Sequence, residues 1–277
     1  MFHLVASARP RTLLFRTHAE AAALFAIVAR TFPELVALCL MPDHLHLLLP
    51  HSDPGERLGA AMSAYARWRN ARRRDSGPVF APAPPAVALP NEEHARRTVR
   101  YIHLNPCRAG LATDPLAWPW STHRDAVGLA ARPIRPRHRD PESFHAYVSG
   151  DPSVHVASTP LPTTPWGDFT WADARDAASA LTRAPLDALL ARGPARTLAL
   201  LTAWYHGPRD ANILAAHAGM LPNAVRRATT AVSARGAPLT DPALAACVRV
   251  VGDPRFSPLH EGDLLRVLTW ARYRALR

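Results

Sequence analysis

The chain contains no lysine, so all 33 of its lysine-plus-arginine residues are arginine. A sequence rich in alanine, arginine and proline but without lysine is typical of a GC-rich coding bias, which raises arginine content for reasons unrelated to function. The net charge of +11 and the isoelectric point near 10.9 are consistent with a nucleic-acid partner. Because of this bias, the distribution of the charge is more informative than its total.

Cysteines and long apolar runs are also scarce. Cys39, Cys107 and Cys247 lie far apart without CxxC spacing, which argues against a disulfide framework and predicts reduced structural thiols. No apolar run approaches the ~20 residues that a membrane span needs. The segment from Met1 to Val5 lacks the charged region and apolar core of a secretory signal. We therefore expect a cytoplasmic, nucleoid-associated protein without a membrane partner.

Length and composition predict two parts. A chain of 277 residues can form one large domain or two ordinary ones, and no internal repeat is visible. The sequence becomes rich in proline and arginine over residues 132–139, and in serine, threonine and proline over 158–165. We predict an N-terminal domain over 1–125, a linker over 126–170 and a helical C-terminal domain over 171–277.

The apolar pattern of the N-terminal part predicts alternating strands and helices. Strands are expected at 2–8, 35–41 and 44–49, with a short fourth strand beginning at 79–80, and helices at 18–32, 54–74 and 92–105. This order predicts an α+β fold with helices on one face of a small antiparallel sheet.

The predicted C-terminal domain contains one segment with a distinctive rhythm. Residues 212–227 form a short helical pattern, a turn at Gly219 and a second helical pattern that ends in arginines. This is typical of a helix-turn-helix DNA-binding unit. An ordinary pair of alanine-rich helices is the other interpretation.

Two histidines interrupt a run that otherwise has the pattern of a buried strand. The segment reads Met41-Pro42-Asp43-His44-Leu45-His46-Leu47-Leu48-Leu49. Since residues i and i+2 of a strand point to the same face, His44 and His46 project side by side. Buried imidazoles need partners for their nitrogens, and a divalent metal ion is one such partner. A pair of half-exposed histidines on an edge strand is the alternative.

Arginines are dense in the helix predicted at 54–74. Residues 1–150 hold 19 arginines against 12 acidic residues, and the remainder holds 14 against 10. The cluster itself comprises Arg67, Arg69, Arg72, Arg73 and Arg74. One interpretation is a solvated helix face. Since matching acidic residues are lacking, we favour contacts with phosphates.

The helix predicted at 92–105 carries a tyrosine and an asparagine that share a face. Tyr101 and Asn105 are four residues apart and therefore one turn apart. If that face meets the histidine strand, Asn105 offers an amide oxygen as a third metal ligand, and Tyr101 presents its hydroxyl beside the metal. The alternative is a core-facing tyrosine with an asparagine at the helix end. His103, between them, is expected to face solvent.

Together these motifs resemble the single-tyrosine HUH transposases, and among them the REP-associated tyrosine transposases. The family has His-x-His on an apolar strand, followed here about 55 residues later by Tyr-Ile-x-x-Asn-Pro. The matching segments are 41–49, 100–111 (Arg-Tyr-Ile-His-Leu-Asn-Pro-Cys-Arg-Ala-Gly-Leu) and 118–122 (Trp-Pro-Trp-Ser-Thr). The resemblance covers residues 1–125.

The resemblance implies a ferredoxin-like antiparallel sheet forming an HUH nuclease domain, here followed by an all-α C-terminal domain. It implies a metal-dependent single-stranded DNA endonuclease and strand transferase that acts at hairpin, REP-like repeats. Tyr101 would be the nucleophile that forms a 5′-phosphotyrosine, and His44, His46 and Asn105 would bind Mg²⁺ or Mn²⁺. The DNA phosphates would be held by Arg67, Arg69, Arg72, Arg73, Arg74, Arg96, Arg97 and Arg100. The protein would be a monomer or a homodimer.

One departure from the family pattern keeps an alternative open. The family usually has a Gly-x-Leu-Trp-Gln-like motif between its two helices, whereas this chain has Gly77-Pro78-Val79-Phe80-Ala81-Pro82. This difference favours a non-catalytic DNA-binding protein that recognises hairpin repeats. The enzyme is favoured by the retained His44, His46, Tyr101 and Asn105. A hydrolase acting through an activated water would leave Tyr101 without a catalytic role.

Overall fold

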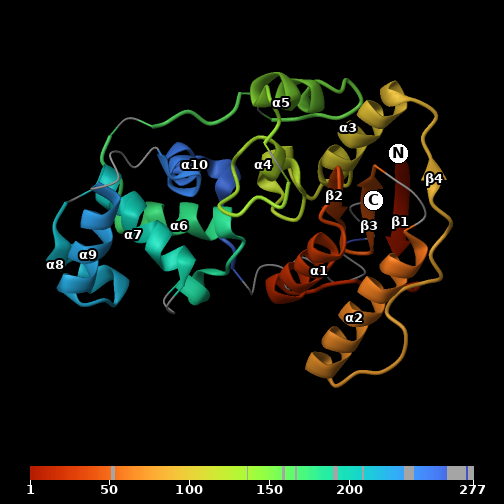
Figure 1. The fold of residues 1–277 in the computed structure, drawn as a ribbon, viewed down its shortest axis with the longest axis horizontal. Helices are drawn as coiled ribbons and strands as arrows, with labels where there is room; N and C mark the ends of the chain where they lie inside the picture. The colour runs from red at the N-terminus through yellow and green to blue at the C-terminus, as the bar shows by residue number, and fades with distance from the viewer. Residues whose placement is uncertain are drawn as a thin grey trace. The chain divides into compact units, whose positions relative to one another are not determined.

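The computed structural model describes residues 1–50, 54–135, 137–157, 160–165, 167–189, 193–207, 209–233, 240–260 and 273. Figure 1 shows its helices and strands. The strands are β1 (Phe2–Ser7), β2 (Ala37–Leu40), β3 (His44–Leu49) and β4 (Val87–Ala88). The first helices are α1 (His18–Thr31), α2 (Gly55–Arg73), α3 (Glu92–Arg108), α4 (His123–Ala126) and α5 (Pro141–Ser149). They are followed by α6 (Trp171–Thr182), α7 (Pro194–His206), α8 (Ala211–Ala218), α9 (Pro222–Ser233) and α10 (Pro242–Val250).

The chain divides into two compact units. One unit comprises Met1–His123, Glu142–Thr159 and Glu261–Arg277, and the other comprises Arg124–Pro141 and Pro160–His260. The interval 126–170, expected as a linker, contains α5, which belongs to the first unit.

The first unit has an α+β fold built on a four-stranded antiparallel sheet, as the sequence predicted. The strand order is β2-β3-β1-β4, so β3 lies in the interior of the sheet, between β2 and β1. All six residues of β3 are buried, which explains its nearly continuous leucine content. In the register of the sheet, Val5 lies opposite His46 and Ser7 opposite His44.

The fourth strand lies later in the chain than expected. β4 pairs with the start of β1, whereas at the predicted position Phe80 forms an isolated bridge to Ala8. Pro78 and Pro82 flank that bridge. Because proline has no N–H to donate to a ladder, the pairing cannot extend there.

Helices cover both faces of the sheet, so the expectation of helices on one face is wrong. Leu4 of β1 lines a cavity with Leu58 and Met62 of α2. Its neighbour Val5 lines a different cavity with Tyr101 of α3. Since successive side chains of a strand point to opposite faces, α2 and α3 lie against opposite faces. Period-2 patterning shows that a face is buried but does not show which helix buries it.

The segment that follows α3 completes the edge of the sheet at β2. The indole Nε1 of Trp118 donates to the carbonyl of Leu40 at 2.9 Å. The backbone N–H of Leu40 donates to the Trp120 carbonyl at 2.8 Å, and that of Thr122 donates to the Leu38 carbonyl at 2.9 Å. The tryptophan-serine motif thus satisfies backbone groups that β2 would otherwise leave open.

The second unit is helical from α6 to α10 in the residues described. A buried cluster links α6, α7, α8 and α9 through Ala174, Leu200, Leu214 and Val225. Among the residues described, no helix has the length and apolar character needed to span a membrane.

Candidate active site

The two histidines of β3 point their Nε2 atoms at each other. These nitrogens lie 3.0 Å apart, and the rings meet edge to face with centroids 4.8 Å apart. His44 is 7% exposed and His46 is 4% exposed. Because β3 is an interior strand and both side chains are buried, the interpretation as half-exposed histidines on an edge strand is wrong.

The remaining nitrogen of each imidazole also has a partner. Nδ1 of His44 lies 2.5 Å from Oδ1 of Asp43, and Nδ1 of His46 lies 3.1 Å from Nε2 of His3. The hydroxyl of Tyr273 donates to the same Asp43 oxygen at 2.7 Å. Burial lowers the pKa of His3, which favours its neutral form. A carboxylate on Nδ1 fixes the tautomer of His44 with the lone pair on Nε2.

Tyr101 lies beside this pair. Its ring is 5.4 Å from the ring of His46 in an edge-to-face arrangement, and the Arg108 guanidinium lies 5.7 Å from its centroid. Tyr101 is 41% exposed, so its hydroxyl is accessible to a large substrate. The condition stated for the sequence is met, because the face of α3 that carries Tyr101 lies against the histidine strand. The role of Tyr101 remains a prediction.

These groups share one small cavity. Its volume is about 290 Å³, and its lining includes Ser7, Arg9, Asp43, His44, His46 and Tyr101. Arg9 is exposed and lies two residues after the end of β1. The cavity therefore combines two converging imidazoles, a phenol and a guanidinium.

The donor set fits a divalent cation. When Nδ1 of each imidazole carries the proton, the two Nε2 lone pairs face each other at 3.0 Å, which is unfavourable unless a proton or a cation lies between them. Two neighbouring ligands of an octahedral ion with bonds of about 2.1 Å have this separation. In the part of the chain that is described, no group of three or more His, Cys, Asp or Glu side chains is placed to hold a metal.

The structure does not bring Asn105 to this cavity. Asn105 is 6% exposed, and its Nδ2 donates to the carbonyl of Tyr101 at 3.4 Å within α3. It does not belong to the cavity lining. Its role as third ligand remains a prediction.

The eight arginines assigned to DNA fall into two groups. Arg67, Arg72, Arg74, Arg96 and Arg97 are exposed. Arg69 is 6% exposed and donates to the Leu13 carbonyl at 3.4 Å. Arg73 pairs with Glu20 at 2.5 Å, and Arg100 with Asp151 at 3.4 Å. The first five lie at the surface, where Arg97 pairs with Glu93. The last three make contacts within the first unit.

The expectation that His103 faces solvent is wrong. His103 is fully buried, and its Nδ1 lies 3.2 Å from Nδ1 of His123. Nε2 of His123 in turn lies 2.9 Å from Nδ1 of His145 in α5. Helical spacing placed His103 off the face of Tyr101 but could not show that α5 covers that side.

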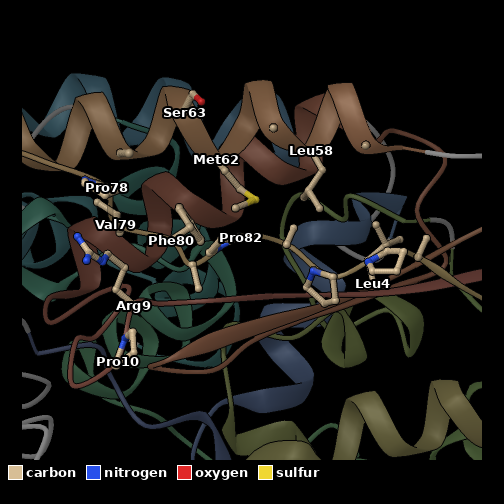
Figure 2. Close-up of a pocket in the computed structure, with 18 residues that line it drawn as sticks. Leu4, Arg9, Pro10, Leu58, Met62, Ser63, Pro78, Val79, Phe80 and Pro82 are labelled. Atoms are coloured by element: carbon tan, nitrogen blue, oxygen red, sulfur yellow. The ribbon is translucent and has the colours of Figure 1, made fainter.

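A larger cavity lies on the other face of the sheet. Its volume is about 930 Å³, and Figure 2 shows Leu58 and Met62 of α2 on one side of it and Phe80 and Pro82 on the other. The lining is mainly apolar, and none of the histidines of β3 belongs to it. The titratable and nucleophilic groups gather at the smaller cavity, which we take as the active-site candidate.

Three functional candidates were missed from the sequence, namely His3, Arg9 and Tyr273. His3 lies within β1 and contacts His46, and Arg9 lies just beyond the end of β1 in the cavity lining. The sequence signal for His3 was its spacing, because His3, Val5 and Ser7 are every second residue of β1 and therefore share one face. Tyr273 lies 230 residues from Asp43 along the chain, and no local pattern indicates that contact.

The first unit is thus an α+β domain whose antiparallel sheet presents two converging histidines to a helix-borne tyrosine. No protein-family model matches the chain, and neither does any curated protein. The chain is similar to a solved structure described as the REP associates tyrosine transposase bound to a REP hairpin. The identity is 23% and the TM-score 0.38, over 49% of this chain and 81% of that one. The description of that structure names the family that the motifs resemble.

Proposed function

We propose that this chain is a metal-dependent single-stranded DNA endonuclease and strand transferase, with Tyr101 as its nucleophile and hairpin repeats as its targets. The observation that carries the proposal is the placement of an exposed tyrosine ring 5.4 Å from one of two imidazoles whose Nε2 atoms converge. A hydrolase that uses water would not require this tyrosine. The sequence motifs and this geometry support the same assignment independently.

The reaction would transfer the DNA backbone to the protein. The hydroxyl oxygen of Tyr101 attacks the phosphorus of a phosphodiester, forming a 5′-phosphotyrosine bond while the bond to the 3′ oxygen breaks. The 3′ oxygen leaves as a hydroxyl after taking a proton. The reverse attack by a DNA 3′-hydroxyl reseals the strand, so no external energy source is needed.

The polar groups around Tyr101 would prepare the phosphate for this attack. A bound Mg²⁺ or Mn²⁺ would polarise the scissile phosphate and stabilise the transition-state charge. His44 and His46 would hold that ion through Nε2, and Asp43 would orient His44. Manganese suits imidazole ligands better, whereas magnesium is more abundant in cells. Arg9 would hold the phosphate at the edge of the cavity.

DNA binding would come from the exposed arginines of α2 and α3. The histidines and the tyrosine of one chain lie together, which supports a site formed within a single protomer. We therefore favour a monomer over a homodimer with a shared site. A cytoplasmic, nucleoid-associated location follows from this proposed role.

The second candidate is a non-catalytic protein that binds hairpin repeats. The altered segment Gly77–Pro82 favours it, because the family motif is missing there. The accessible Tyr101 beside two buried, oriented imidazoles favours the enzyme.

A covalent-adduct assay separates the two. We expect wild-type protein incubated with labelled single-stranded hairpin DNA and Mn²⁺ to give an adduct that survives a denaturing gel. Tyr101→Phe should abolish the adduct, and His44→Ala should reduce it strongly. Tyr205→Phe, a tyrosine of the second unit, is the matched control and should retain it.

Three other results would contradict the proposed enzyme or one of its assigned residues. If wild type bound the hairpin without forming an adduct, the non-catalytic candidate would be correct. An adduct that persisted in Tyr101→Phe would rule out this nucleophile. Cleavage that His44→Ala left unchanged would rule out the metal assignment.

A further inference from the structure

Helices α7, α8 and α9 of the second unit form a compact three-helix arrangement, and each of the three contacts the other two. Helix α8 has eight residues and α9 has twelve. A connection of three residues, Gly219–Leu221, joins them. Figure 1 shows these helices together within the second unit. A short helix, a three-residue turn with glycine and a longer second helix are the parts of a helix-turn-helix.

The turn is built by local geometry. Gly219 has φ +59°, the left-handed conformation that glycine adopts without strain, and it ends α8. The N–H of Met220 donates to the carbonyl of Ala215 at 3.0 Å, and the N–H of Val225 donates to the carbonyl of Leu221 at 3.2 Å. Helix α8 thus ends and helix α9 begins within three residues.

The packing of these helices leaves one face of α9 outside the core. The core contains Leu200 and Ala203 from α7, Leu214, Ala215 and Ala218 from α8, and Val225 from α9. Met220 and Ala228 pack against it. The alanines of α8 are small, which allows the helices to approach closely. This burial orients α9 and turns Asn223, Arg226, Arg227 and Thr230 to solvent.

The exposed face of α9 carries the residue types that recognise DNA bases and phosphates. Helix α9 contains two arginines and no acidic residue. Nη1 of Arg226 donates to Oδ1 of Asn223 at 2.8 Å, so these two side chains are held side by side. Arginine forms paired hydrogen bonds with guanine and asparagine with adenine in the major groove. The positive charge also complements the phosphates on either side of that groove.

We propose that α9 is a recognition helix that binds double-stranded DNA in the major groove. Asn223 and Arg226 contact base edges, and Arg227 contacts a phosphate. The site is independent of the tyrosine chemistry proposed above, because it uses none of the same residues and takes a duplex rather than a single strand. The protein would then select a duplex sequence with its second unit.

Selection from a random-sequence duplex library by the full-length protein tests this proposal. We expect wild type to enrich a defined motif. The variant Arg226→Ala/Arg227→Ala should bind that motif at least about tenfold more weakly, with an unchanged thermal unfolding midpoint. The matched control is Arg132→Ala/Arg139→Ala, which removes the same charge from exposed positions of the same unit and should bind like wild type.

A second variant separates base reading from charge. Arg226→Lys keeps the positive charge but loses the paired hydrogen bonds. It should therefore lose preference for the selected motif over random duplex while keeping its affinity for random duplex. This variant also remains informative if the double substitution disturbs the fold.

Three results would overturn the proposal. They are no enriched motif with wild type, wild-type affinity in Arg226→Ala/Arg227→Ala, and an equal loss of affinity in the Arg132→Ala/Arg139→Ala control. The hairpin adduct assay in parallel separates the two proposals. Duplex selection without adduct would contradict the tyrosine chemistry alone, and adduct without duplex selection would contradict the recognition helix alone.

Discussion

At the scale of single residues, the site is determined by what lies behind the two imidazoles. Asp43 holds Nδ1 of His44 at 2.5 Å, and His3 holds Nδ1 of His46 at 3.1 Å. These contacts direct both Nε2 atoms into the cavity. Partners of this kind fix the orientation of a ligand and raise its basicity.

Asp43→Asn should weaken metal binding by about 10–100-fold, because an amide neither enforces the tautomer of His44 nor supplies negative charge. Titration of the protein with Mn²⁺, followed by calorimetry, measures this. Asp75→Asn, an exposed carboxylate of the same unit, is the control. Equal affinity in wild type and Asp43→Asn would contradict the role of Asp43.

Glu20 gives a residue-scale prediction about stability. It is 5% exposed and pairs with Arg73, and the backbone N–H of Arg16 donates to it at 2.6 Å. Burial by itself raises the pKa of Glu20, but these hydrogen bonds outweigh it and the net pKa lies below its ordinary value. Glu20→Gln should lower the free energy of unfolding by about 3 kcal/mol at pH 7, since Arg73 loses its counter-charge.

The sign of the pH dependence follows from that lowered pKa. The contribution of Glu20 is fully present above its unfolded-state pKa, about 4.3, and is lost as the pH falls through the lower folded-state value. Denaturant unfolding between pH 7 and pH 3 should show Glu20→Gln approaching wild type in acid. Glu34→Gln breaks the exposed pair with Arg57 and should cost less than about 1 kcal/mol. A constant difference between Glu20→Gln and wild type across this range would contradict the account.

At the scale of elements, α3 is the part that positions Tyr101, the proposed nucleophile. Asn91 begins it by accepting the N–H of His94 at 3.0 Å, and the helix continues through Pro106 to Arg108. Two residues after Tyr101, His103 enters a buried chain of imidazoles with His123 and His145. This chain ties the C-terminal half of α3 to α5.

Replacing the central imidazole tests that connection. His123→Leu should lower the free energy of unfolding by about 2–3 kcal/mol, because it removes the hydrogen-bond partner of two buried groups. His94→Leu changes an exposed histidine at the start of α3 and should stay within about 0.5 kcal/mol of wild type. Thermal unfolding measures both. Similar midpoints for the two variants would show that the chain contributes little to stability.

At the scale of the whole molecule, some of the arginines that make the chain basic make contacts within the fold. The net charge is +11, yet Arg69 of α2 is buried and Arg73 is paired with Glu20. Burial lowers the pKa of Arg69, with a further contribution from nearby Arg73. Charge counted along the sequence therefore overstates the charge available to phosphates.

Substitutions in α2 separate the two uses of arginine. Arg67→Ala/Arg72→Ala/Arg74→Ala should reduce the salt dependence of hairpin binding by a slope of about 2, at ~0.7 per single-strand contact, with little change in stability. Arg69→Ala should instead destabilise the fold, because its guanidinium donates to the Leu13 carbonyl. Binding isotherms at several salt concentrations, together with thermal unfolding, measure both effects. A steeper loss of DNA binding in Arg69→Ala than in the triple variant would contradict this division.

Local features were predictable from the sequence. The bounds expected for the third strand match β3, and the helices expected at 18–32 and 54–74 match α1 and α2 closely. Apolar periodicity, caps and prolines act within a few residues, so they are visible in the chain itself. The pairing of His44 with His46 on one face, and of Tyr101 with Asn105 on one helix, depends on the same short-range rules.

The sequence alone therefore determined the first three strands, the main helices of the first unit and the types of residue proposed for the chemistry. Tertiary structure decided that β3 lies inside the sheet and that α2 and α3 cover opposite faces. It also decided that His103 and Arg69 are buried, and that His3 and Tyr273 reach the histidine site. The reason is physical. These outcomes rest on contacts between segments far apart in the chain. Such contacts form only when the folded chain buries its apolar surface and at the same time gives its buried polar groups hydrogen-bond partners.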